Sequence, residues 1–348
     1  MSRVHVNRLK EVAIHILKGL NASDEEAALV AESLVLADMR GTDTHGVHLL
    51  TILSGRVDAG MVQVPTHLTI LKEEGTTATI DGGNGLGQVA VHRAMTMGIK
   101  KAKEFGVACV LVRNTNNIGI LSFYSLMAAR EGMIGIVMSN AAPSMSPWGG
   151  AEALLGTNPL SIAFPGGGEL PAVALDMSST VVARGKIRRA ERLKESIPQG
   201  WAFDETGVAT TDASKALTGT LAPIGGPKGY GLALMIDVLA GLLSGSKYGP
   251  QVETFHQLLG PTGVGVFTLT IDIERFMPSL QFNQLIRAYL ESIKSSKKAK
   301  GVSRIYVPGE IEYEKEKESL REGIEISEEL VKGLNRLLER FKSPLRIS

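Results

Sequence analysis

The first 60 residues show helical spacing of apolar side chains three times in succession. Apolar positions recur every three or four residues over 7–21, which predicts an amphipathic helix. A second helix is predicted over 23–38, because its first residue is a serine followed three residues later by Glu26, the pattern of a capping box. A third apolar face runs over 47–57 and ends at Gly60.

The middle of the chain alternates between short β-branched runs and helical patterns. Strands are predicted where valine, isoleucine and threonine cluster, and helices where the apolar spacing returns to three and four. The expected strands are 68–72, 77–81, 107–112, 134–138, 162–164 and 173–176, and the expected helices are 89–105 and 121–130. Strands and helices at such close spacing predict an α/β layer.

The remaining segments are more polar or less regular. Residues 113–117 are predicted to form a polar turn, and the polar span 184–214 carries a charged connector, 186–195. Toward the C-terminus the pattern predicts an edge strand over 264–271 and helices over 232–243, 280–296 and 326–341. No internal repeat or low-complexity linker occurs, so we expect any second domain to be interleaved with the first.

Composition narrows the class of protein. A chain of 348 residues with a formal net charge of +1 gives no sign of a nucleic-acid partner. The single cysteine, Cys109, lies in an apolar run, excludes an internal disulfide and fits a reducing compartment. The N-terminus lacks the apolar core of a signal peptide, and no run approaches the roughly 18 apolar residues of a membrane span. We therefore expect a cytoplasmic protein with no membrane partner.

The most distinctive stretch is Arg40–Val47, between the second and third predicted helices. It is expected to place His45 at the start of a helix, with Asp43 or Thr44 as the cap. The positive end of the helix dipole favours a neutral imidazole, which can donate or accept a proton near neutral pH. A histidine at a helix start is ordinarily a cap or a surface residue, so other motifs must support a catalytic role.

Two glycine clusters invite a nucleotide-binding interpretation. The cluster 83–87 does not match the dinucleotide fingerprint, because Gln88 stands where the last glycine is needed. The cluster 225–231 places Lys228 at a helix N-terminus, where backbone N–H groups and an ammonium group can bind a phosphate or a carboxylate. A tight turn into a buried helix is the equally acceptable structural interpretation.

Two histidines and one acidic residue are further candidates for a binding site. His45 and His48 are spaced i, i+3, as two metal ligands can be, but no third ligand stands nearby, so no metal site is predicted. Asp176 ends a predicted strand, which is where ligand sites gather in α/β proteins, although a capping role is also common. Lys186 follows in the same span, and the remaining histidines are assigned to the surface or to structure.

Taken together, nine motifs occur in an order and spacing that resemble one family. They are ADMRG with THGV at 37–47, GLGQ at 85–88, RNTN at 113–116, GTNP at 156–159, LDMS at 175–178, GK at 185–186, IP at 197–198, GPKGYG at 226–231 and PGE at 308–310. The chain resembles the malate/L-lactate dehydrogenase family of the second type, which includes sulfolactate and ureidoglycolate dehydrogenases and diketogulonate and piperideine-2-carboxylate reductases.

The resemblance implies an architecture and an activity. It implies a sulfolactate dehydrogenase-like fold, with a non-Rossmann NAD(P)-binding α/β domain built on a mixed sheet over 73–221. A helical domain is expected from 1–72 together with about 222–348. It further implies a homodimeric oxidoreductase that interconverts a 2-hydroxy acid and a 2-oxo acid, with NAD as cofactor, NADP as a possibility and a small carboxylate as substrate.

By position in the motifs, the resemblance also implies the site residues. His45 is the proton donor and acceptor, and Asp176 orients or charge-supports it. Substrate-binding positions are His48, Leu49, Leu53, Asn117, Thr157 and Lys228. Cofactor-binding positions are Ser139, Leu175, Asp176, Met177, Ser178, Ser179, Thr180, Lys186, Pro227, Lys228, Gly309 and Glu310.

Three of these positions depart from the family pattern. The family usually carries arginine at Leu49, histidine at Asn117 and, in several members, tyrosine at Leu53. A substrate carboxylate facing Leu49 lacks an interaction worth roughly 1.5 to 3 kcal/mol. We therefore expect a 2-oxo acid or cyclic imino acid with a less polar tail, or a carboxylate bound elsewhere, by Lys228, Arg56 or His48. Alternatives are an imino-acid reductase and a family member that binds cofactor without turnover.

Overall fold

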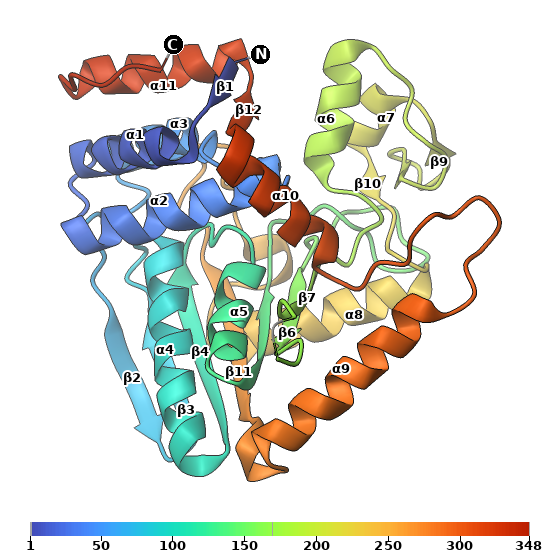
Figure 1. Ribbon diagram of the computed structural model, residues 1–348. Helices are drawn as coiled ribbons and strands as arrows, with labels where there is room; N and C mark the ends of the chain where they lie inside the picture. Colours follow the sequence, from blue (N-terminus) through green and yellow to red (C-terminus); the bar gives the residue numbers. More distant parts are fainter. Residues whose placement is uncertain (1, 169, 348) are drawn as a thin grey trace.

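The computed structural model describes residues 2–168 and 170–347. Figure 1 shows a central sheet with helices on both faces and a helical layer across one end. The helices are α1 Val6–Gly19, α2 Asp24–Met39, α3 Leu49–Asp58, α4 Gly87–Phe105, α5 Ser122–Arg130, α6 Arg184–Leu193, α7 Ala213–Thr218, α8 Pro227–Asp237, α9 Ser279–Ser295, α10 Glu310–Glu322 and α11 Glu328–Arg340. Short helical turns are η1 Asp43–His45, η2 Val238–Leu242, η3 Gly249–Gln251 and η4 Ile273–Arg275.

The strands form three sheets. They are β1 Ser2–Val4, β2 Thr69–Glu74, β3 Thr77–Asp81, β4 Val107–Thr115, β5 Met133–Ser139, β6 Leu160–Phe164, β7 Val173–Met177, β8 Ala202–Phe203, β9 Ala209–Thr210, β10 Thr220–Leu221, β11 Val264–Asp272 and β12 Ile324–Ile326. The large sheet has the order β2-β3-β4-β11-β5-β6-β7. Only β3 and β4 pair in parallel, so the sheet is mixed, as expected.

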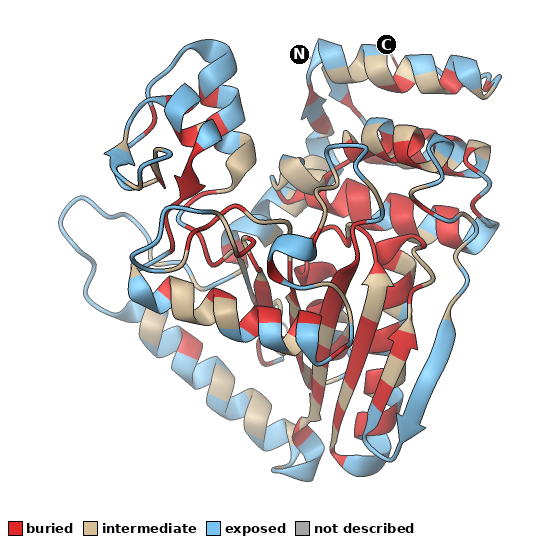
Figure 2. Ribbon diagram, turned by 180° about the vertical axis from the view of Figure 1, so that it is seen from behind, coloured by how far each residue is buried: buried red, intermediate tan, exposed pale blue. Residues whose placement is uncertain are grey.

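The large sheet is covered on both faces. Helices α4 and α5 pack together on one face, while η2 and α8 pack on the other against β5 and β11. Helices α1, α2, α3 and α11 form the layer at one end, where β1 pairs with β12 and so joins the two chain termini. Figure 2 shows buried residues concentrated in the sheet and in the helices that contact it.

The strand predicted over 264–271 forms, but its predicted place at the edge of the sheet was wrong. β11 lies in the middle of the large sheet, antiparallel to β4 on one side and to β5 on the other. Burial alternates along the strand: Val266, Thr268 and Thr270 are fully buried, whereas Phe267, Leu269 and Ile271 on the other face are half-buried, so both faces are covered. The threonine hydroxyls are satisfied internally, for example by Thr268 donating to the Val110 carbonyl oxygen at 2.8 Å.

Three other segments also differ from the prediction. The polar turn expected over 113–117 is strand β4 as far as Thr115, because Arg113 pairs with Asp81 of β3. The charged connector is helix α6, whose Ile187 and Ala190 are buried, while most of its basic side chains are exposed. Helix α10 was not predicted, because its highly charged sequence gives only a weak apolar face.

Residues around 182–221 form a small lobe with a core of its own. Helices α6 and α7 pack against each other beside the three-stranded sheet β10-β8-β9. Its buried apolar residues are Val182, Ile187, Ala190, Ile197, Ala202, Ala213, Ala216 and Leu221. The lobe returns to the body of the protein where Thr180 pairs with Pro223, just before α8.

Candidate active site

His45 lies on a tight turn between two helices, not at a helix start. It is the last residue of the single helical turn η1, and α3 begins four residues later with His48 as its N-cap residue. The capping role predicted for Asp43 or Thr44 was therefore wrong, since neither side chain caps η1. Instead, the Thr44 hydroxyl oxygen lies 3.0 Å from Nδ1 of His45 and occupies that ring nitrogen.

Asp38, near the end of α2, stabilises this turn through its carboxylate. Its carboxylate accepts a hydrogen bond of 2.8 Å from the Val47 backbone N–H. A Cβ atom on Gly46 would lie only 1.8 Å from the Asp38 Oδ1 atom, so the turn requires glycine at that position. Burial, with Asp43 nearby, raises the pKa of Asp38 to about 7 although the Val47 hydrogen bond opposes the shift.

The imidazole of His45 is neutral at physiological pH. Burial lowers the pKa of His45 to about 4, and the neighbouring imidazoles of His48 and His256 lower it further, while Asp43 opposes them. The sequence argument attributed a neutral imidazole to a helix dipole. In the structure, burial and the neighbouring imidazoles of His48 and His256 lower the pKa instead, because His45 ends η1 and precedes the first turn of α3.

Asp176 lies in β7, and its carboxylate accepts a hydrogen bond of 2.7 Å from the backbone N–H of Ser122. Ser122 is the first residue of α5, so the carboxylate sits at a helix N-terminus, where negative charge is favoured. Desolvation by the surrounding protein nevertheless raises the pKa of Asp176, and its contacts with Ser122 and Arg40 oppose this shift. The residue as a whole remains exposed to solvent. No hydrogen bond joins Asp176 to His45 within residues 2–168 and 170–347; its proposed role stays a prediction.

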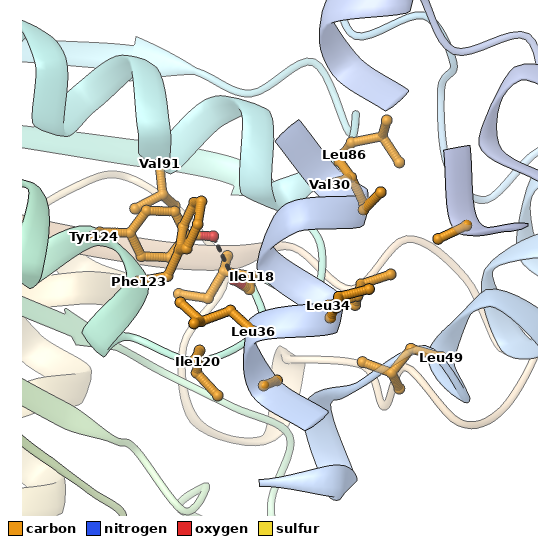
Figure 3. Close-up of a cluster of buried hydrophobic side chains, with 14 of the residues drawn as sticks. Val30, Leu34, Leu36, Leu49, Leu86, Val91, Ile118, Ile120, Phe123 and Tyr124 are labelled. Carbon is orange, nitrogen blue, oxygen red and sulfur yellow. Dashed lines mark hydrogen bonds between the residues drawn. The ribbon is translucent and has the colours of Figure 1, made fainter. Parts of the chain in front are cut away.

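The three positions that depart from the family pattern lie around one small pocket. Leu49 and Leu53 are buried on α3, and Asn117 faces them together with Phe255 and Gln88. Figure 3 shows Leu49, Leu34 and Leu86 in one cluster of buried hydrophobic side chains, and all three line this pocket. The space left between these side chains holds about one water molecule. The side-chain oxygen of Asn117 already has a partner, since it accepts a hydrogen bond of 2.9 Å from the Gly119 N–H.

His256 lies near His45, although no sequence pattern predicted a role for it beyond the surface or structure. Although exposed, His256 lies close enough to His45 to lower the pKa of that residue. Its own pKa is lowered to about 4 by burial of the ring, then by Arg188, His48 and Arg56. No local motif marks this histidine, because it approaches His45 only through the folding of a loop more than 200 residues away in sequence.

Arg56 was named as a residue that could bind the substrate carboxylate, and its position makes it unsuitable. The side chain is completely buried on α3 and donates to the carbonyl oxygens of Gln257 and Gly260, both at 2.7 Å. It also reaches the Thr254 carbonyl oxygen at 3.3 Å and lies over the Phe255 ring. Arg56 therefore holds the loop that carries His256.

Several predicted cofactor positions gather where β7 meets the start of α8. Both the backbone N–H and the hydroxyl of Ser179 donate to the Thr157 carbonyl oxygen, at 2.9 and 2.8 Å. The Ile224 N–H donates to the Ser179 carbonyl oxygen at 2.9 Å, which brings Pro227 and Lys228 to the same place. Leu175, Met177, Ser178 and Thr180 belong to this segment, with the Ser178 hydroxyl bonded to Thr180.

The other predicted cofactor positions are dispersed. The buried Ser139 hydroxyl donates to the carbonyl oxygens of Asn140 and Gly265, and Lys186 is exposed on α6. Gly309 packs against the backbone of Ala174 in β7, where a Cβ atom would lie 2.8 Å from the carbonyl oxygen. Its neighbour Glu310 is buried beside a pocket between α9 and α10.

Glu310 is the centre of an ion cluster. Lys294 and Arg304 both bond to its carboxylate, and the Val307 backbone N–H donates to it at 3.1 Å. Burial alone raises the pKa of this carboxyl, but these three donors outweigh burial and the net pKa is lowered. The Glu310 side chain is thus occupied by structural contacts.

The described residues contain neither a metal-binding cluster nor a membrane-spanning helix. Within 2–168 and 170–347, no group of three or more histidine, cysteine or acidic side chains is arranged to hold a metal ion. No helix in that same part of the chain combines the length and apolarity required to cross a membrane.

Known proteins similar to this chain identify its family. A model of the malate/L-lactate dehydrogenase family matches residues 4–335. The chain belongs to the malate/L-lactate dehydrogenase family. It is thus a dehydrogenase acting on CH–OH groups, in a family of 2-hydroxy acid dehydrogenases, and the resemblance seen in the nine motifs is confirmed.

Individual relatives cover almost the whole chain. The L-sulfolactate dehydrogenase of Methanocaldococcus jannaschii is 40% identical over 328 residues, 94% of each chain. The malate dehydrogenase of Pyrococcus horikoshii is 38% identical over 346 residues, 97% of this chain and 95% of the relative. The solved structure of the M. jannaschii sulfolactate dehydrogenase superposes with a TM-score of 0.93, at 37% identity over 98% of both chains, which confirms the expected fold. Relatives use NAD(+) or NADP(+).

Proposed function

We propose that this dehydrogenase interconverts a 2-hydroxy acid and a 2-oxo acid with NAD or NADP, and that His45 accepts and returns the proton. The observation that carries the proposal is the state of His45, a neutral imidazole on the turn η1 of a chain that belongs to this family. A neutral imidazole is a competent base for the hydroxyl proton of a 2-hydroxy acid.

The contacts of His45 support this role. Thr44 occupies Nδ1, which leaves Nε2 for the substrate hydroxyl. The Asp38 carboxylate and Gly46 keep the turn in one conformation, so the ring need not be ordered when substrate binds. In the reverse direction His45 returns its proton to the carbonyl oxygen, and we assign Asp176 to support the positive charge that the ring carries meanwhile.

The start of α8 fits a dinucleotide cofactor, whose bound nicotinamide supplies or removes the hydride. The N-terminus of α8 has no side-chain cap and no acid in its first turn, and Lys228 is exposed there. Free N–H groups, the helix dipole and an ammonium group together suit a pyrophosphate. Pro227, Lys228 and the segment Leu175–Thr180 would hold it, and Glu310, Gly309, Ser139 and Lys186 are the weaker candidates.

We further propose a substrate with a less polar tail than malate. Leu49 and Leu53 are buried in the pocket that Asn117 and Phe255 also line, and that pocket offers no cation. If this assignment is correct, Leu49→Arg increases kcat/KM for oxaloacetate by about 10-fold or more, the value of a hydrogen bond to a charged group. Unchanged kcat/KM for every tested substrate would count against it.

We propose that the protein is a homodimer. Met235, Val238 and Leu242 are exposed along α8 and η2, as is Leu243 directly after η2, and exposed apolar residues gathered in this way mark interaction surfaces. A second copy of this chain would bury them. Light scattering after size-exclusion chromatography should give the mass of a dimer, and Leu243→Glu should shift it toward that of a monomer; a monomeric wild type would contradict the proposal.

The proposed activity is tested by NADH and NADPH oxidation with pyruvate, oxaloacetate, sulfopyruvate, phenylpyruvate, branched 2-oxo acids and piperideine-2-carboxylate. We expect turnover of a 2-oxo acid, and a loss of about two to four orders of magnitude in His45→Ala, as for a general acid or base. His15→Ala is the matched control, because His15 is exposed on α1. Cofactor binding without turnover of any substrate would support a family member that has lost its activity.

A further inference from the structure

Four elements at or around the turn η1 carry cationic or titratable side chains: His48 and His256 act on His45, and Arg188 acts on His256. The elements are the turn η1 with His45, the residue before α3 with His48, the loop 253–262 with His256, and helix α6 with Arg188. The first turn of α6 touches η1 directly, since a Cβ atom on Gly185 would lie 3.1 Å from the Thr44 side chain. The small lobe therefore packs against the turn that carries His45.

The loop that carries His256 is held firmly. At its base the Glu253 N–H donates to the Thr262 carbonyl oxygen at 3.1 Å. In its middle the buried Arg56 guanidinium bonds to carbonyl oxygens on both sides of His256. The backbone of His256 is thus held in place, and the residue as a whole is exposed.

The side chains of Arg188 and His256 lack a partner among the described residues. The side chains of Arg188 and His256 make no ion pair or hydrogen bond with any residue in 2–168 and 170–347, whereas Arg184 on the same helix bonds to the Leu217 carbonyl oxygen. Asp43 is the acid that faces His45 and His48, and it does not act on His256. Arg188 therefore carries a positive charge without an ion-pair partner among the described residues, and an anion beside it is favoured.

We propose that Arg188 and His256 bind the carboxylate of the substrate beside His45, in the role that the family resemblance assigns to an arginine at Leu49. An arginine presents two parallel donors to a carboxylate, and His256 adds a third. Leu49 lies in an apolar pocket and cannot do so. This assignment rests on the proposed function, since it takes the substrate to react at His45.

Two measurements test the assignment. The first is the dissociation constant of oxamate, an unreactive analogue of a 2-oxo acid, measured by calorimetry with and without NADH. The second is the ratio of kcat/KM for the preferred 2-oxo acid to that for its methyl ester, which lacks the charge. The variants are Arg188→Gln and His256→Gln, and the control is Arg189→Gln, an exposed arginine one position along α6.

We expect Arg188→Gln to weaken oxamate binding about 10- to 100-fold and to lower the preference for the acid over its ester by a similar factor. Arg189→Gln should change both by less than about threefold, because an exposed charge away from the ligand contributes little. Unchanged oxamate binding and unchanged preference in both Arg188→Gln and His256→Gln would overturn the assignment.

The results also separate this inference from the proposed function. If wild type turns over a 2-oxo acid through His45 and Arg188→Gln behaves as wild type, the carboxylate site is wrong and the dehydrogenase activity stands. If no substrate is turned over but oxamate binding depends on Arg188, the anion site stands and the proposed activity is wrong.

Discussion

The turn that carries His45 requires glycine at position 46, because glycine has no side chain. A Cβ atom there would overlap the Asp38 carboxylate at 1.8 Å, and Asp38 cannot retreat without losing its hydrogen bond to Val47. We expect Gly46→Ala to lower the free energy of unfolding by about 1 to 3 kcal/mol, the usual cost of overpacking. The loss should be visible in urea unfolding, together with reduced activity.

Gly55 provides the matched control for that substitution. It lies inside α3, and a Cβ atom there would meet nothing within 4 Å. Gly55→Ala should therefore stabilise the protein by about 0.5 to 1 kcal/mol, because alanine restricts the unfolded chain and favours the helix. Equal effects of the two substitutions would show that the contact with Asp38 is unimportant.

The pKa of His45 sets the pH dependence of the proposed reaction. As the base for oxidation of a 2-hydroxy acid, His45 must be neutral, so activity is lost as the pH falls through its pKa. Because that pKa is about 4, kcat/KM for oxidation should show no fall near pH 6.5 and should decline only as the pH approaches 4.

The measurement is a profile of kcat/KM between pH 4.5 and 8, with each sample returned to pH 7 to check that it stayed folded. Asp38 complicates the profile, because its pKa is raised to about 7 and it holds the same turn. An inflection near pH 7 that disappears in Asp38→Asn belongs to that carboxyl. An acid limb at pH 6.5 that Asp38→Asn retains would contradict the assigned state of His45.

At the scale of an element, the loop 253–262 depends on one buried side chain. Arg56 donates to carbonyl oxygens of this loop and lies over the Phe255 ring. Arg56→Ala removes these bonds and leaves buried carbonyl groups without donors, so we expect a loss of about 2 to 5 kcal/mol in the free energy of unfolding. The loop should also exchange its amide hydrogens faster.

Arg340 is the control for Arg56, because it contacts the same helix, α3, at the protein surface. Arg340 forms an ion pair with Asp58 at the end of α3, at 2.6 Å, and both side chains are about half exposed. Arg340→Ala should cost about 1 kcal/mol or less and should leave exchange in the loop unchanged. Comparable losses for the two variants would show that Arg56 does not organise the loop.

At the scale of the whole molecule, the position of β11 is the main topological result. β11 pairs with a neighbour along both edges, whereas β2 lies at the edge of the sheet and all six of its residues are exposed. Hydrogen exchange should therefore be slowest in β11 and its partners β4 and β5, and faster in β2. Equal protection of β2 and β11 in exchange mass spectrometry would contradict the central placement.

Much of the local structure was predictable from sequence because its causes are local. The capping box of Ser23 and Glu26 forms as expected, and β3 has the predicted bounds. The start of α8 with Lys228 follows from glycine and proline positions a few residues apart. The motifs identified the family for the same reason, since each is a short pattern that can be recognised without its partners.

What only the tertiary structure decided are the relations between distant segments. Nothing within Val264–Asp272 shows that β4 and β5 lie on either side of it, because a strand's edges are satisfied by other parts of the chain. Helix α6 was read as a connector, since its apolar face is only two buried residues wide. His256 has no local motif, and its place beside His45 depends on Arg56 and on the fold that buries it. Sequence determined which residues can do chemistry, and packing determined which of them meet.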